Sequence, residues 1–145
     1  MKNNDLHNNI HPLVGIAPVA ARTDDTAIVS TIVDTRGYGS CEFVIVTGTN
    51  TDADATFSVL VEDADEVAFN VTNAAVADAQ LLGTEALAGF TYADDAETRK
   101  IGYIGGKRYV RVTVTPSGNG AGNIFLAGVW LLGNPSIAPT ANPPV

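Results

Sequence analysis

Hydrophobic and polar residues alternate with a period of two in several short runs of the chain. This alternation, with turn residues between the runs, predicts strands at 27–34, 40–48, 55–62 and 66–71, and we also expect strands at 86–92 and 124–132. In the second run, for example, Cys41, Phe43 and Ile45 share one side of the expected strand. Successive side chains of a strand point to opposite faces of its sheet, so such runs can bury one face and solvate the other. We therefore expect an all-β protein with mostly antiparallel strands.

One stretch follows a different pattern. Residues 74–82 (Ala-Ala-Val-Ala-Asp-Ala-Gln-Leu-Leu) consist mainly of good helix formers. Asn73 can cap the first turn, and Gly83 can end the last one. The sequence therefore predicts one helix of two or three turns at this point.

The pair Gly105–Gly106 lies between two further strand-like runs and predicts a two-residue hairpin loop. In the resulting register Tyr103 faces Arg108, Gly102 faces Tyr109 and Lys100 faces Arg111. One face of this ribbon then holds the apolar side chains, with Tyr103 and Arg108 near the turn. The apolar residues of this face are Ile101, Val110, Val112 and Val114.

The other face of the expected hairpin gathers Lys100, Lys107, Tyr109 and Arg111. Like charges directly opposite each other, here Lys100 and Arg111, cost a few tenths to about 1 kcal/mol. The ribbon therefore needs acidic groups nearby, either from its own chain or from a partner. The simpler alternative is a solvated strand face without a binding role.

The last predicted strand is apolar on both faces. Ile124, Leu126, Trp130 and Leu132 alternate with Phe125, Ala127, Val129 and Leu131. An antiparallel strand usually exposes one face to water, so we expect the core to cover one face and an arm or another subunit to cover the other. Proline-containing segments at 1–25 and 133–145 predict extended arms. The body, 26–132, is expected to be an antiparallel β-sandwich of jelly-roll or immunoglobulin-like type.

Length and composition indicate a single domain. The 145 residues have 46% hydrophobic content and a formal net charge of −8. Twelve acidic residues and no lysine or arginine lie within 37–98, whereas five of the eight basic residues lie within 99–111. A net acidic chain argues against nucleic-acid binding. The separation of an acidic segment from a basic one suits pairing between two copies of the chain. One cysteine precludes an internal disulfide, and no secretory or membrane-spanning run is present, so we expect synthesis in the cytoplasm.

Few residues offer catalytic or metal-binding chemistry. The two histidines, His7 and His11, fall in the expected N-terminal arm, so we expect no enzyme activity. Asp52, Asp54 and the acidic cluster 62–66 lack the glycine and terminal glutamate of a calcium loop. No helix follows Gly105–Gly106 to complete a phosphate site. We therefore expect no catalytic residue, metal or cofactor, and interpret the acidic groups as solvated turn charges.

Five segments carry a further signal, and they are Asp34–Phe43, Val46–Thr49, Asp52–Val59, Leu81–Thr84 and Ile101–Arg111. Together they resemble a family of small structural proteins encoded near the head genes of tailed bacteriophages. The stretch Gly-Tyr-x-Gly-x-Lys-Arg-Tyr-Val-Arg is the most specific of these. The resemblance spans roughly residues 10–135, and it implies a virion protein of the capsid decoration or cement type.

The working hypothesis is a homo-oligomer, a dimer or trimer, that binds the major capsid protein on the outer surface of the virion and stabilises the head. Arms and strand edges would make the contacts, without nucleic acid or membrane. Residues that we expect in the interface are Lys100, Lys107, Arg108, Tyr109, Arg111 and Trp130. The alternatives are a β-sandwich module that binds carbohydrate or a receptor, and a head-completion or tail component.

Overall fold

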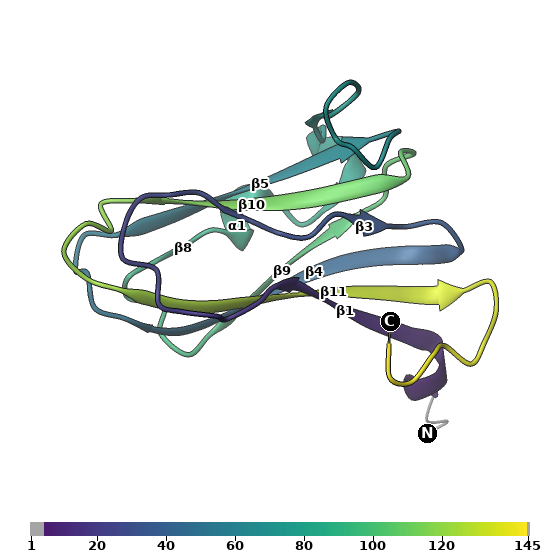
Figure 1. Cartoon of the computed structure of the whole chain (residues 1–145), viewed down its shortest axis with the longest axis horizontal. Coiled ribbons are helices and arrows are strands. Elements are labelled where there is room, and N and C mark those ends of the chain that lie inside the picture. The colour runs from purple at the N-terminus through teal and green to yellow at the C-terminus, as the bar shows by residue number, and fades with distance from the viewer. Residues whose placement is uncertain (1–4, 145) are drawn as a thin grey trace.

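The computed structural model describes residues 5–144 and consists of two antiparallel sheets that pack face to face (Figure 1). The five-stranded sheet has the order β1 (Ile10–Ile16), β11 (Ile124–Pro135), β4 (Tyr38–Asn50), β9 (Thr98–Tyr103) and β7 (Leu81–Leu82). The six-stranded sheet contains β2 (Ile28–Val29), β10 (Tyr109–Ser117), β5 (Thr56–Ala64) and β6 (Ala74–Ala75), with β3 (Val33–Asp34) paired to β10 and β8 (Phe90–Thr91) paired to β5. The prediction of an all-β fold is confirmed.

The core lies between the sheets and is built from the alternating positions. Phe43 of β4 and Trp130 of β11 are buried and lie opposite each other, with ring centroids 4.5 Å apart. The indole Nε1 of Trp130 donates a hydrogen bond to the Thr31 carbonyl at 3.1 Å, so the one polar atom of this ring is satisfied. From the opposite sheet, β10 contributes Val110 and Val112, which are fully buried.

The predicted hairpin at Gly105–Gly106 is wrong. β9 pairs with β4 and β7 in the five-stranded sheet, whereas β10 pairs with β2, β3 and β5 in the other. The segment between them crosses from one sheet to the other, and neither glycine has a positive φ. Consequently Lys100 lies opposite Val44 and Arg111 lies opposite Glu62, and the two cations never face each other.

The buried positions of this segment were nevertheless predicted correctly. Ile101, Val110, Val112 and Val114 all face the core. Both a hairpin and a crossing between sheets direct alternate residues toward the same core, so the pattern alone does not distinguish them.

The terminal segments belong to the folded body. Residues 10–16 form β1, which is the edge strand beside β11 (Figure 1). At the other end β11 continues to Pro135, and Thr140 then donates backbone and hydroxyl hydrogen bonds to the carbonyls of Asn8 and Ile10, at 3.0 and 2.6 Å. Extended arms over the whole of 1–25 and 133–145 are therefore not confirmed within residues 5–144, because 10–16 and 133–135 belong to strands.

The predicted helix at 74–82 is also wrong. This stretch contains β6, a 3₁₀ turn η2 (Asp78–Gln80) and β7. The α-helix is a single turn, α1 (Glu85–Ala88), where we expected a strand, and Thr84 caps it by accepting a hydrogen bond from the Leu87 N–H at 3.1 Å. A second 3₁₀ turn, η1 (His7–Asn9), precedes β1. The strand expected at 66–71 is a loop.

Candidate assembly face

The outward surfaces of the two sheets differ in chemistry. On the six-stranded sheet, outward positions of β5 and β10 are mainly polar or charged: Thr56, Ser58, Glu62, Arg111, Thr113 and Thr115. Arg111 and Glu62 form an ion pair there, with 2.7 Å between Nη2 and Oε2. This is the usual arrangement for an antiparallel sheet, with one face on the core and the other in water.

The outward surface of the five-stranded sheet is mainly apolar, and its polar members are Ser40, Glu42, Thr98 and Lys100. We call it the apolar face, and its apolar members are Pro12, Val14, Val44, Val46, Leu82, Phe125, Ala127, Val129 and Leu131. Strand pairing places Val14, Val129 and Val44 in one row across β1, β11 and β4. The exposed fractions are 62% for Val14, 42% for Val46 and 49% for Phe125.

Val14, Val46, Leu82 and Phe125 are at least 42% exposed on this surface, and the sheet neighbours of β11 and β4 lie beside them in the plane of the sheet (Figure 1). Exposed leucines continue the apolar surface at two edges, where Leu6 lies beside a hollow with Leu131 and Leu87 lies beside one with Leu82. A contiguous apolar patch on a protein surface marks an interaction site more often than isolated apolar residues do.

Two charged side chains, Glu42 of β4 and Lys100 of β9, lie at strand positions of the apolar face. Glu42 is opposite Gly102, and a Cβ built on Gly102 would come within 2.7 Å of Glu42 Oε2. Gly102 therefore leaves room for the carboxylate, rather than for Tyr109 as the hairpin predicted. Burial raises the pKa of Glu42, while the positive charge of Lys100 acts in the opposite direction.

Most of the cations predicted to form the interface are instead paired within the chain. Lys107 Nζ lies 3.2 Å from Asp63, and the guanidinium of Arg108 donates to both carboxylate oxygens of Asp34 at 2.8 and 2.6 Å. Arg108 also lies over the Tyr109 ring, 4.9 Å from its centroid.

The six predicted interface residues therefore do not form one surface. Trp130 is only 1% exposed and belongs to the core. Lys100 alone lies on the apolar face. The sequence did indicate the double apolar character of β11, which is the signal that locates this face, but we expected the contacts from the arms and from the basic segment 100–111.

The remaining candidates for catalysis or metal binding are His11 and acidic residues such as Asp52. His11 is buried and stacks on Tyr38, with centroids 5.7 Å apart. Asp52 accepts a hydrogen bond from the Ala121 N–H at 2.8 Å, which lowers its pKa. Within residues 5–144 no three histidine, cysteine or acidic side chains are grouped as metal ligands, and no helix is both long and apolar enough to span a membrane.

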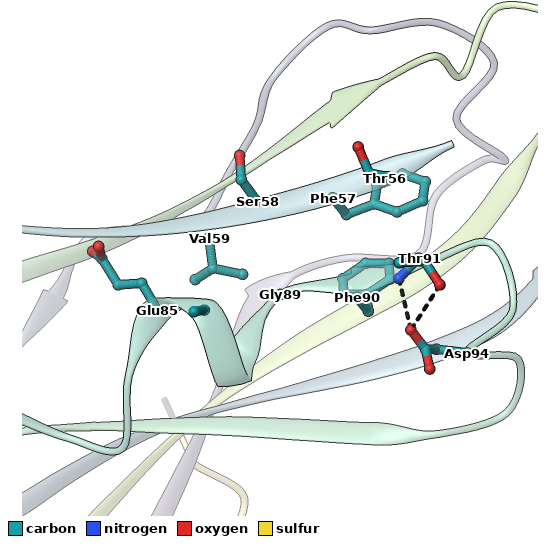
Figure 2. Close-up of a pocket in the computed structure, with 10 residues that line it drawn as sticks. Thr56, Phe57, Ser58, Val59, Glu85, Gly89, Phe90, Thr91 and Asp94 are labelled. Carbon is teal, nitrogen blue, oxygen red and sulfur yellow. Dashed lines mark hydrogen bonds between the residues drawn. The ribbon is translucent and has the colours of Figure 1, made fainter. Parts of the chain in front are cut away.

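A hollow lies between β5 and α1 and continues along β8 (Figure 2). Its carboxylates are engaged, since Glu85 accepts from the Val61 N–H at 2.7 Å and Asp94 accepts from the Thr91 N–H at 2.7 Å. Phe57 and Phe90 stack with centroids 4.6 Å apart, but both rings are buried. The hollow therefore offers hydroxyl groups without an exposed aromatic platform.

Comparison with known proteins gave no match to a protein family model and no match among curated proteins. Among solved structures, dimeric latent PorU from Porphyromonas gingivalis matches 87% of this chain with 10% identity and a TM-score of 0.42, and the chain spans 13% of its length. A xylan-binding module, CBM15, matches over 92% of this chain and 96% of its own, with 11% identity and a TM-score of 0.42. A family two carbohydrate esterase from Cellvibrio japonicus has 15% identity over 91% of this chain and 36% of its own, with a TM-score of 0.33.

Proposed function

We propose that this protein is a virion structural protein of a tailed phage, of the capsid decoration type, and that it acts by binding alone. The observation that carries the proposal is the apolar face, on which Val14, Val46, Leu82 and Phe125 are exposed. The resemblance of segments such as Ile101–Arg111 to phage head proteins is the reason for proposing a capsid as the binding partner.

The strand order supports a jelly roll as the finer description of the sandwich. β2 and β3 both pair with β10 and count together as the second strand, and β6 and β8 both pair with β5 and count as the fifth. Numbered in this way along the chain, the strands have the order 1-8-3-6 in one sheet and 2-7-4-5 in the other, with β7 added at one edge. This arrangement of two four-stranded sheets is the jelly-roll pattern that viral capsid and lectin domains share. The jelly-roll fold supports this function only by analogy with other proteins. The physical argument for binding comes from the apolar face.

Binding through a sheet face replaces binding through arms and a basic ribbon. Thr140 ties the C-terminal segment to residues 8–10 of the same chain, and Lys107, Arg108 and Arg111 already have acidic partners. Covering roughly 400 Å² of apolar surface would yield about 10 kcal/mol at 25 cal/mol per Å². Association itself costs about 4–15 kcal/mol, so single contacts are weak and a repetitive shell would strengthen them by multivalency.

The test uses capsids of the phage that encodes the chain, prepared without this protein. Purified protein should cosediment with them at many copies per particle, and Val46→Lys should lower occupancy at least tenfold. Val29→Lys is the matched control, because Val29 is also a half-exposed strand valine, at 51%, but lies on the six-stranded sheet. Absence of cosedimentation would refute the proposal, and labelling at a single vertex in electron micrographs would replace it with a head-completion role.

The hollow beside α1 supports a second candidate, a carbohydrate- or receptor-binding module. Thr56, Ser58 and Thr91 supply hydroxyl groups at its rim. Binding of the isolated protein to a glycan array, reduced by Ser58→Trp and unaffected by Val46→Lys, would favour this function over decoration.

A further inference from the structure

We propose that the occupant of the apolar face is a second copy of this chain, which forms a two-fold dimer by stacking one five-stranded sheet on the other. The inference rests on the proposed function only in treating this surface as an assembly face. It adds the identity of the partner on this face. In that case the capsid contacts other surfaces of the dimer, and Val46→Lys lowers capsid occupancy by removing the second copy.

Charge complementarity favours a second copy. The chain has a net charge of −8, yet the strand positions of the apolar face contain one acid, Glu42, and one base, Lys100. The face is therefore neutral, whereas most of the remaining surface repels another copy. A two-fold axis repeats every contact between the copies. The acid of each copy can therefore pair with the base of the other.

The positions of the two charges suit this symmetry. Glu42 lies opposite Gly102 and Lys100 lies opposite Val44, so the two side chains are diagonal neighbours on β4 and β9. Diagonal neighbours on one sheet face are about 7–8 Å apart. A two-fold axis in the plane of the interface, passing between them, directs Glu42 of each copy toward Lys100 of the other.

The dimensions of the face approach those of a specific interface. At about 3.3 Å per residue and about 4.8 Å between strands, β1, β11, β4 and β9 give a surface about 30 Å long and 15–20 Å wide. That is roughly 500 Å² before the relief of the side chains, and Leu6, Leu82 and Leu87 extend it at the edges. Standard interfaces bury about 800 Å² per partner, so we expect a dimer that dissociates on dilution in the micromolar range.

The decisive experiment exchanges charges between copies. Sedimentation equilibrium of the full chain should show a monomer–dimer equilibrium, and E42K or K100E alone should each weaken dimerisation at least tenfold because like charges then meet across the axis. An equimolar mixture of E42K and K100E should form a heterodimer again, since both cross-axis contacts then join opposite charges. Contacts within one chain cannot restore dimerisation in this way, because each variant has two charges of the same sign at these two positions.

The apolar contribution has its own matched pair of variants. Val46→Lys should abolish the dimer, and Val29→Lys should leave its dissociation constant within twofold of the wild type. A far-ultraviolet circular dichroism spectrum and the urea midpoint of each variant establish that it is folded.

The outcomes separate the dimer from the decoration role. A wild-type chain that remains monomeric to millimolar concentration, or a mixture of the two charge variants without heterodimer, overturns the inference. If such a monomer still binds capsids and Val46→Lys abolishes the binding, the decoration role stands and the capsid protein is the occupant. A dimer that does not bind capsids retains the inference and refutes the decoration role.

Discussion

The Tyr103 hydroxyl of β9 donates a hydrogen bond of 2.8 Å to Asp63 of β5 and thereby joins the two sheets through the core. The same oxygen accepts the Lys107 N–H at 2.9 Å, and Lys107 Nζ completes the network with a contact of 3.2 Å to Asp63. The segment that crosses between the sheets is thus fixed at both ends by one buried carboxylate. Burial, followed by the hydrogen bond to Asp63, raises the pKa of Tyr103.

Tyr103→Phe should destabilise the protein, because Asp63 and the Lys107 N–H both lose a partner inside the fold. A buried polar group without a hydrogen bond costs about 1–3 kcal/mol, and urea unfolding should show a loss of this size. Tyr92→Phe is the control, since Tyr92 is 44% exposed. An equal effect of both substitutions would contradict the role of the network.

The same tyrosine predicts a sensitivity to alkali. The pKa of Tyr103 is raised above its ordinary value of 10.0 in the folded chain, so the unfolded chain releases this proton first. Its contribution to stability is complete below pH 10 and declines as the pH rises further. Tyr103→Phe should reduce the slope of unfolding free energy against pH above 10, and an unchanged slope would show that other groups cause it.

Gly105→Ala and Gly106→Ala should differ in their effect on stability although the glycines are adjacent. A Cβ on Gly105 would lie 2.4 Å from the Tyr103 ring, whereas one on Gly106 would meet nothing within 4 Å. We expect Gly105→Ala to destabilise the fold by about 1–3 kcal/mol through overpacking. Gly106→Ala should be neutral or stabilise by up to about 1 kcal/mol, because it restricts the unfolded chain. Thermal unfolding of the two variants in parallel makes the comparison.

These glycines explain why the sequence misidentified the crossing segment. Two glycines between alternating runs are typical of a hairpin, because such a turn requires positive φ. Here Gly105 is needed for the close approach of the Tyr103 ring, a contact that only the folded structure reveals. The alternation still predicted the core side of both strands. It could not predict which sheet each strand joins, since sheet partners such as Val112 and Val61 are 51 residues apart in the chain.

Arg111 and Glu62 should behave as an ion pair of the fold, without a role in assembly. They are directly opposite on β10 and β5, and their side chains are 25% and 15% exposed. Arg111→Ala and Glu62→Ala, combined in a double-mutant cycle by urea unfolding, should give a coupling of about 1 kcal/mol after allowance for solvent screening. Arg111→Ala should leave dimerisation and capsid attachment unchanged, and a loss of either would return this residue to an interface.

The terminal segments show a second limit of local patterns. Proline and asparagine around Pro12 predict an irregular arm, but Pro12 lies in β1, at an edge of the sheet where its missing N–H is tolerated. β1 covers the free edge of β11 and adds Val14 to the apolar face. The double apolar pattern of β11 was therefore the informative signal in the sequence. The cations of 100–111 were misleading as interface candidates. Their pairing, such as that of Lys107 with Asp63, depends on contacts between residues far apart in the chain.

Glu66 should make the loop 66–72 sensitive to acid. Its carboxylate accepts hydrogen bonds from the Thr72 hydroxyl and from the backbone N–H groups of residues 70–72, which lower its pKa from 4.5 to about 2. The depressed pKa stabilises the folded loop above pH 4.5, and this contribution is lost as the pH falls toward 2. Hydrogen exchange at residues 70–72 should therefore lose protection over this range.

Glu66→Gln should abolish most of this protection already at pH 7, whereas Asp65→Asn should retain it, because Asp65 is the exposed neighbour. Protection in Glu66→Gln that equals the wild type at pH 7 would show that the carboxylate does not order the loop.

Cys41 should report on the opening of the sandwich. The thiol lies in β4 between Tyr103 and Leu132, is 6% exposed, and has its pKa raised to about 12, first by burial and then by Glu42. The thiolate is the reactive form, so the folded protein should be labelled by a maleimide at pH 8 only as fast as it opens. Moving the thiol by one residue, in Ser40→Cys with Cys41→Ala, should give rapid labelling because Ser40 is exposed. Equal rates for the two proteins would mean that β4 separates locally from its neighbours, and the five-stranded sheet would then be too mobile to present a fixed apolar face.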